Sequence, residues 1–392
     1  MDRSTARALQ GALALAAAMG IGRFAYTALL PATQRALGIG DRSAGALASL
    51  NLAGYLAGVV VARQLSSRPG RGALLRLGLA LVAFTTLVGA FTSSPGVWSA
   101  LRFTAGVASG LVFVLASAAA LEGAASRPGL LYAGVGPGIA LSGAVAALGG
   151  PAAPSGPAWS LLGIAAGLLS IPAWLHLASS PPRAAASAQP RAAPTLTIGR
   201  LAAAYFLEGL GYIVSGTFAV AAVRRVEGLA AFAPWTWVLT GVAAAPSALF
   251  WTAVGARFGP RRGLIAAHLL QGAGMALSAS SNSPLAVLLG GAVFGGTFMG
   301  IVTLAMEAGR DLAPGAPGRI VGTLTAVYGV GQIVGPLAAG AISERLGDPR
   351  PAVLMAAAAV ALGGALLGLP SHPPVREAGL EAPPEEEDAC RT

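Results

Sequence analysis

The amino-acid sequence predicts an all-α membrane protein with twelve transmembrane helices in two pseudo-symmetric six-helix bundles. Three observations lead to this fold class. Of the 392 residues, 55% are hydrophobic and only 10% are charged, whereas soluble domains carry about 25% charged residues. The apolar residues gather into twelve stretches, each close to the about 20 residues that cross a bilayer. Short patterns in the first half also recur, in the same order, in the second half.

The first six spans are expected at 8–31, 43–64, 73–92, 96–121, 130–150 and 157–178. The first one follows Arg3 and Arg7 and could be a cleaved signal peptide. Its apolar pattern, however, continues past Ala18 to Leu30, and further spans follow, so we interpret it as a membrane helix. The last six spans are expected at 199–222, 234–256, 263–281, 285–307, 320–343 and 350–369.

The arginines are distributed unevenly between the loops on the two sides of this topology. Most of them lie on the same side as the N-terminus, in the terminal segments and in the loops that follow the even-numbered spans. Cytoplasmic loops of membrane proteins are enriched in basic residues. We therefore expect a multi-pass protein of the bacterial cytoplasmic membrane, with both termini in the cytoplasm and the lipid bilayer as its main solvent.

The chain divides into four segments. Residues 1–178 form the N-terminal six-helix half, and residues 199–369 form the C-terminal half. Between them, residues 179–198 are rich in Pro, Ala and Ser, which is typical of a flexible cytoplasmic linker. Residues 370–392 are acidic and proline-rich with little apolar surface, so we expect a disordered cytoplasmic tail.

Internal repeats support the two halves. Each short match is weak alone, but their common order strengthens them. The matching pairs are Gly20-Ile21-Gly22 with Gly209-Leu210-Gly211, Gly58–Arg63 with Thr252–Arg262, and Val135-Gly136-Pro137 with Val334-Gly335-Pro336.

Composition also excludes several functions. The chain contains no lysine, so it can form neither a P-loop nor a Schiff base. Its one cysteine, Cys390, allows no internal disulfide and no cysteine-based metal site. The net charge of +10 is better explained by basic loops beside a membrane than by nucleic-acid binding. We expect no cofactor and no metal.

Several of these segments resemble the major facilitator superfamily (MFS). The loop after the eighth span is similar to the family's loop signature at Arg257, Gly259, Arg261 and Arg262, although Ala256 replaces its Asp. The loop after the second span keeps Gly58 and Arg63 with the same loss of the Asp. The resemblance implies that Arg63, Arg257, Gly259, Arg261 and Arg262 belong to gating loops.

A narrower resemblance is to the YbfB/YjiJ-type branch of that family. It is carried by GIGRFAYTALLP (Gly20–Pro31), NLAGYLAG (Asn51–Gly58), LEGLGYIVSGTF (Leu207–Phe218) and GQIVGP (Gly331–Pro336). The similarity covers nearly all of the spans but neither the linker nor the tail. It implies the major facilitator fold, with spans 1, 4, 7 and 10 around a central cavity.

Three ionisable residues lie well inside spans, where a charge costs about 2.5–3.5 kcal/mol on insertion scales. Glu208 is the candidate for proton coupling, and a structural hydrogen bond is the alternative. Aligning the two Gly-x-Gly pairs places Arg23 opposite Tyr212, with Glu208 about one turn away. Arg23 could bind an anionic substrate, pair with Glu208, or both in different states. Arg102 could snorkel near one membrane face, and a proton-relay or a structural role stays open.

Other polar and small residues complete the candidate site. Tyr26, Tyr212 and Thr297 could line the substrate or proton pathway. Pro137 and Pro336 are expected to kink their helices. Five G-x-x-x-G pairs are expected to be packing seams. They begin at Gly54, Gly106, Gly134, Gly291 and Gly331.

The sequence thus predicts a monomeric secondary transporter that moves a small-molecule substrate by alternating access, coupled to protons. A membrane-embedded enzyme would need a His/Asp/Glu cluster near one interface, and the sequence offers none. A permease subunit of an ATP-driven transporter would need a coupling helix and a partner, and the two-half repeat argues against it.

Overall fold

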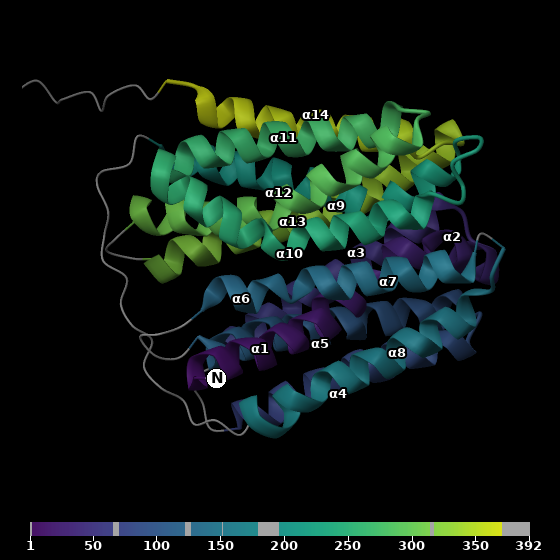
Figure 1. Cartoon of the computed structure of the whole chain (residues 1–392), viewed down its shortest axis with the longest axis horizontal. Coiled ribbons are helices and arrows are strands. Elements are labelled where there is room, and N and C mark those ends of the chain that lie inside the picture. The colour runs from purple at the N-terminus through teal and green to yellow at the C-terminus, as the bar shows by residue number, and fades with distance from the viewer. Residues whose placement is uncertain are drawn as a thin grey trace, which may run out of the picture.

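Helices make up all of the regular secondary structure in the part of the chain that the structure describes. The computed structural model describes residues 2–65, 70–121, 127–150, 152–178, 196–313 and 317–370. The expected linker, apart from residues 196–198, and the expected tail beyond Pro370 lie outside these residues, as does Cys390. Figure 1 shows the two halves as two groups of roughly aligned helices.

The N-terminal half contains the first six spans. Its elements are α1 (Arg3–Leu15), the π-helical η1 (Ala16–Ile21), α2 (Ala25–Leu37), α3 (Asp41–Leu65), α4 (Arg71–Val88), η2 (Gly89–Phe91), α5 (Pro95–Ala120), α6 (Pro128–Ala133), α7 (Val135–Gly149), α8 (Ser155–Pro172) and η3 (Ala173–Leu177). The C-terminal half contains α9 (Ile198–Arg224), α10 (Ala233–Phe258), α11 (Pro260–Ser280), α12 (Pro284–Leu312), α13 (Pro317–Leu346) and α14 (Arg350–Gly368).

Local sequence explains several helix ends. The side chains of Asp2, Ser94 and Thr197 accept hydrogen bonds from backbone N–H groups in the first turns of α1, α5 and α9, as N-cap residues do. At the end of α2, Gly38 adopts a φ of 63°, which glycine reaches without the steric penalty of a side chain.

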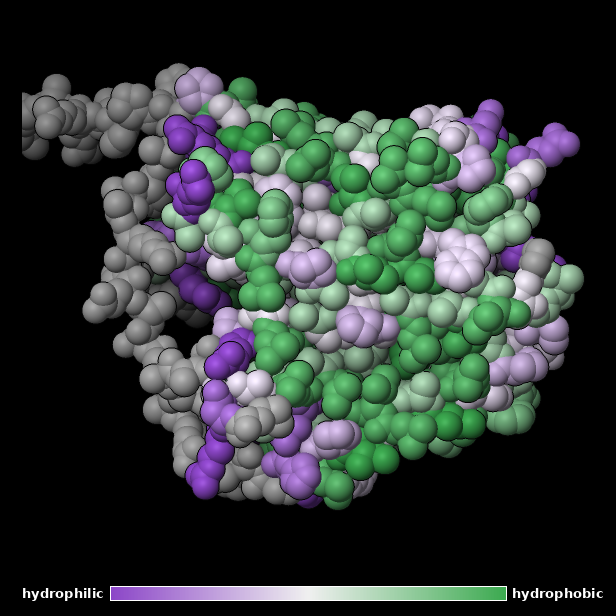
Figure 2. All heavy atoms as spheres, in the orientation of Figure 1, coloured by the Kyte–Doolittle hydropathy of each residue, from purple (hydrophilic) through white to green (hydrophobic). Residues whose placement is uncertain are grey.

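Each of the twelve predicted spans falls on a helix or a broken helix. Eleven helices of the described chain are long and apolar enough to cross a membrane, judged by length and composition only. The predicted ninth span, α11, is not among them because His268 and Gln271 lower its mean hydropathy. It is nevertheless a 21-residue helix packed between α12 and α14. Figure 2 shows the corresponding apolar belt, with hydrophilic residues gathered toward two opposite ends.

The first span is broken near its middle, which the sequence did not predict. The π-helical η1 follows α1, and residues 22–24 form a turn before α2 begins at Ala25. Gly20 lies so close to Gly138 of α7 that a Cβ atom at Gly20 would be 2.5 Å from the Gly138 Cα. Short π-helical segments often mark functional sites, and this one directly precedes Arg23.

The same pairs of spans pack together in both halves. α3 packs on α5 as α10 packs on α12, and α4 packs on α8 as α11 packs on α14. Between the halves, α3 packs on α13 and α7 packs on α10. These are span 2 with span 11 and span 5 with span 8, which is the exchange that a twofold relation between repeats produces.

Small residues allow these close contacts, as the sequence predicts. A Cβ atom on Gly106 of α5 would lie 2.0 Å from the carbonyl oxygen of Asn51 in α3. Between the halves, a Cβ on Gly45 would lie 2.1 Å from the carbonyl oxygen of Pro336. Each of the five predicted G-x-x-x-G seams meets the backbone of a neighbouring helix, so they are packing seams.

The two prolines expected to kink helices differ in their surroundings. Pro137 is the third residue of α7 and follows the interruption at Gly134 between α6 and α7. Pro336 lies inside α13, which continues as one helix through it. Bending at both positions stays a prediction.

Candidate functional site at the interface of the two halves

Arg23 crosses from the N-terminal half to the C-terminal half at the break in the first span. Its side chain is only 5% exposed. Nη2 donates a hydrogen bond of 2.8 Å to the hydroxyl of Tyr212 in α9 and another to Oε1 of Gln332 in α13. The Tyr212 hydroxyl in turn donates to Gln332 Oε1 at 3.2 Å. One guanidinium thus joins two helices of the opposite half, α9 and α13.

Aromatic rings surround this contact. The guanidinium carbon of Arg23 lies 4.6 Å from the ring centre of Tyr55 and 5.0 Å from that of Phe24, within the range of cation–π attraction. Tyr212 stacks on Phe298 at 5.9 Å and on Tyr328 at 5.5 Å between ring centres. The site therefore combines one cation with flat apolar surfaces.

Arg102 lies behind Arg23 within the N-terminal half. It is 5% exposed, and its two terminal nitrogens donate to the carbonyl oxygens of Gly22 and Arg23 at 3.3 and 3.5 Å. Its guanidinium carbon lies 4.5 Å from the ring centre of Tyr26, whose hydroxyl donates to the carbonyl oxygen of Ala44. The expectation that Arg102 snorkels toward a membrane face is wrong, because the break in the first span frees carbonyl groups that attract it inward.

Glu208 lies in a separate polar cluster inside the C-terminal half. Its side chain is 0% exposed. Oε1 accepts a hydrogen bond of 2.7 Å from Nε2 of Gln271 in α11, and Gln271 Oε1 accepts one of 3.1 Å from the hydroxyl of Thr297 in α12. Oε2 is buried without a hydrogen-bond partner among the described residues.

The structure does not pair Arg23 with Glu208, contrary to one of the expectations from sequence. The six predicted pathway residues instead form two groups. Arg23 and Tyr212 meet between the halves, with Arg102 and Tyr26 beside them, whereas Glu208 and Thr297 belong to the cluster around Gln271. Tyr212 is one turn, or roughly 6 Å, along α9 from Glu208, but their hydrogen-bond partners belong to different helices, Gln332 of α13 for Tyr212 and Gln271 of α11 for Glu208.

The helix bundle has a basic end and a far end. The basic end is where α1 and α9 begin, at Arg3 and Ile198. The far end is the opposite one, where α2 ends at Leu37 and α13 ends at Leu346.

The predicted gating residues lie at the basic end and differ in the contacts that they make. Arg63 at the end of α3 reaches the opposite half and lies against Gly322 of α13. A Cβ atom added to this glycine would be only 2.9 Å from Nη1 of Arg63. Arg261 instead donates hydrogen bonds of 2.8 Å to the carbonyl oxygens of Leu367 and Leu369, and so caps the end of α14. Arg257 and Arg262 are exposed, and Gly259 joins α10 to α11 with a φ of 87°.

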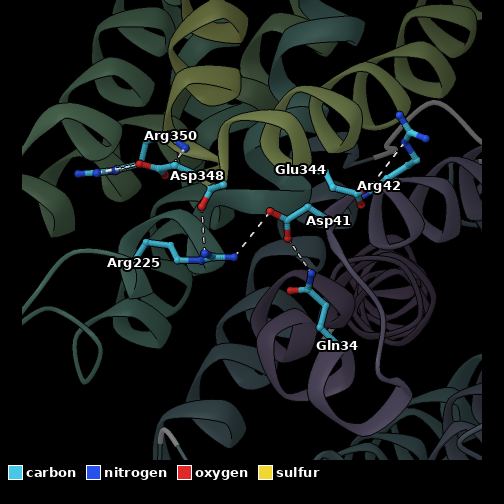
Figure 3. Close-up of polar contacts among 8 residues, drawn as sticks. Gln34, Asp41, Arg42, Arg225, Glu344, Asp348 and Arg350 are labelled. Atoms are coloured by element: carbon cyan, nitrogen blue, oxygen red, sulfur yellow. Dashed lines mark hydrogen bonds and ion pairs between the residues drawn. The ribbon is translucent and has the colours of Figure 1, made fainter.

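At the far end, ionic contacts join the halves, and the sequence analysis did not identify them (Figure 3). Asp41 at the start of α3 is 6% exposed; it lies 3.8 Å from Nη2 of Arg225 and accepts a 2.7 Å hydrogen bond from Gln34. Glu344 of α13 accepts a 3.1 Å hydrogen bond from the backbone of Arg42 and lies 3.9 Å from its Nε. Gln34, Asp41, Arg225 and Glu344 border a cavity of about 570 Å³.

Other site residues were also missed. Gln271, Tyr55, Tyr328 and Phe298 were not selected, although a glutamine inside a span is a usable signal because it needs a partner there. Among the described residues, no group of three or more His, Cys, Asp or Glu side chains could hold a metal ion.

Comparisons with known proteins agree with this architecture. Residues 15–368 match the family described as "Uncharacterised MFS-type transporter YbfB". A search of curated protein sequences gives no significant match.

Solved structures of transporters share the fold. A mutant of the nucleoside transporter NupG superimposes with a TM-score of 0.73 at 13% identity, over 93% of this chain and 99% of that one. A bacterial homologue of the human lysosomal transporter Spinster, inward-facing and occupied, gives 0.71 at 14% identity, over 94% and 97%. A D-xylose-proton symporter gives 0.71 at 14% identity, over 93% and 96%. The family match covers most of the chain, which therefore belongs to the YbfB-type transporters of the major facilitator superfamily.

Proposed function

We propose that this protein is a proton-coupled secondary transporter that carries a small molecule across the bacterial cytoplasmic membrane by alternating access. The observation that carries the proposal is the Arg23 contact with Tyr212 and Gln332, because it joins the two halves at a break in the first span. Two proteins of similar structure, a nucleoside transporter and a D-xylose-proton symporter, support a small-molecule substrate and a proton gradient.

The packing of the first span supports movement between the halves. α1 makes extended contact only with elements of its own half, whereas α2, beyond the break, packs on α9. The ionic contacts at the far end also join the halves.

The basic end carries most of the arginines, and we propose that it faces the cytoplasm. A single chain is the proposed transporting unit.

Glu208 is the residue that we propose links transport to protons. A buried carboxylate without a cationic partner is costly, and among the described residues Glu208 contacts Gln271 but no cation. Water that reaches Glu208 in another conformation would change the cost of its ionisation. Proton binding is then coupled to the conformation, which is what a proton-driven transporter requires.

The test is uptake by proteoliposomes under an imposed pH gradient, with labelled nucleosides, sugars and carboxylates as probes. We expect Glu208→Gln to retain exchange of a transported probe but to lose accumulation against its gradient. Glu227→Gln, which changes an exposed acid in the loop after α9, should accumulate the probe like the parent protein. If Glu208→Gln also accumulates it like the parent, Glu208 is structural and the proton path lies elsewhere.

A further inference from the structure

The charge of Arg23 has no acidic partner among the described residues. Its hydrogen-bond acceptors are a tyrosine hydroxyl and an amide oxygen. The ion pairs Arg42–Glu344, Arg127–Asp2, Arg225–Asp41 and Arg350–Asp348 lie near the ends of the bundle. Nε is buried without a partner. The site is therefore a buried cation held only by neutral groups.

Nearby charges do not compensate it. Arg102 adds a second cation on the same side, bound to two backbone carbonyl groups and to the face of Tyr26. Glu208 is turned toward Gln271 and Thr297. Burying a charge costs free energy that neutral hydrogen bonds and aromatic faces recover only in part. An anion that enters the site would supply the missing charge.

We propose that the transported substrate is a small carboxylate with an apolar or aromatic body, and that Arg23 binds its carboxylate. Guanidinium groups bind carboxylates through paired N–H donors, and Arg23 has donors left beyond Nη2. The rings of Tyr55 and Phe24 lie against the guanidinium, and Phe298 packs on Phe24, so the surroundings of the bound carboxylate are aromatic and match an apolar body better than a polar one. This inference rests on the proposed function and specifies its substrate class.

The first test needs no knowledge of the substrate. Gln332→Glu places a carboxylate against the Arg23 guanidinium and so imitates a bound anion. We expect it to raise the Tm of the purified protein by at least about 2 °C. Adding Arg23→Gln to this variant should abolish the gain, because the new carboxylate then has no cation to pair with.

A matched control exists in the second cluster. Gln271→Glu makes the same chemical change beside Glu208, where it sets two carboxyl groups together, and it should lower the Tm. If Gln332→Glu leaves the Tm unchanged or lowers it, the charge of Arg23 is already compensated and the inference is wrong.

The second test measures binding directly. The probes are benzoate, phenylacetate and butyrate, each paired with its neutral amide, and the readout is the Tm of the protein at increasing probe concentration, since a ligand of the folded state raises it. We expect the acids to raise the Tm and the amides not to. Gln332→Glu and Arg23→Gln should each weaken acid binding at least about tenfold.

The outcomes separate this inference from the proposed function. If the amides bind as well as the acids, or if no acid of the panel binds, the substrate class is wrong. Transport of a nucleoside or a sugar in the proteoliposome screen would still uphold the transporter. If nothing is transported while the acids bind Arg23, the site stands and the transport proposal fails.

Discussion

At the scale of single residues, the polar side chains inside the spans differ in how completely they are satisfied. Gln271 contacts the cluster on two sides, since its amide nitrogen donates to Glu208 and its amide oxygen accepts from Thr297. Glu208 depends on it, because its other carboxylate oxygen is buried without a partner among the described residues. Gln271 is therefore expected to stabilise the C-terminal half.

Replacing this glutamine tests that role. Gln271→Leu leaves the buried Glu208 without its donor, so we expect a loss of about 1–3 kcal/mol in the free energy of unfolding, read as a lower Tm. Gln64→Leu, at an exposed position of α3, should change the Tm little. In a double-mutant cycle, Gln271→Leu should lower the Tm less in a Glu208→Leu background, because no buried carboxylate then needs the donor. Equal losses from Gln271→Leu with and without Glu208 would show that the two residues are not coupled.

The sequence predicts part of this residue-level picture. Alignment of the repeats selects Arg23 and Tyr212 as corresponding positions of the two halves, and the structure joins them by a 2.8 Å hydrogen bond that the alignment alone does not predict. The expected contact between Arg23 and Glu208 does not form, because spacing along a helix does not reveal which neighbouring helix each side chain faces. Gln271 lies in the least hydrophobic of the twelve spans, and its relation to Glu208 becomes visible only when α9 and α11 are packed.

At the scale of secondary-structure elements, two ion pairs join the ends of α3, α9 and α13 at the far end. We call these pairs, Asp41–Arg225 and Arg42–Glu344, the far-end lock. The separations of 3.8 and 3.9 Å in the Asp41–Arg225 and Arg42–Glu344 pairs are long. Both partners of the second pair and the arginine of the first are solvent-exposed, and exposed ion pairs contribute about 0–1 kcal/mol each. A lock of this strength favours one conformation without preventing its exchange with another. The twelve spans could be predicted from hydropathy, but not this lock, because its partners are far apart in sequence.

Labelling can measure the opening of this lock. We expect Asp41→Asn with Glu344→Gln to increase the reaction of Ser343→Cys with a membrane-impermeant maleimide in intact cells, in a Cys390→Ser background. Ser343 is 0% exposed in this structure and borders the far-end cavity. Asp348→Asn, which breaks only a contact within the C-terminal half, should not increase labelling. Labelling only after lysis would contradict the proposed orientation, and equal labelling in all variants would contradict the lock.

At the scale of the whole molecule, the pairs of spans in contact follow the repeat of the two halves. Span 2 contacts span 11 and span 5 contacts span 8, so the halves meet through two equivalent helix pairs. The order of the short repeats made this arrangement predictable. The break in the first span was not predictable, because η1 is built from ordinary apolar residues and depends on the approach of Gly138 of α7 to Ala16 and Gly20.

The central claim is that the two halves move relative to one another and expose the Arg23 site alternately to each side. Pulsed electron paramagnetic resonance on spin-label pairs measures this most directly, in the Cys390→Ser background. One pair replaces Ser93 and Asn282 in loops at the far end, and the other replaces Arg3 and Arg257 at the basic end; all four are exposed. We predict that Asp41→Asn with Glu344→Gln lengthens the far-end distance and shortens the basic-end distance. Unchanged distances at both ends, or changes of the same sign, would contradict alternating access.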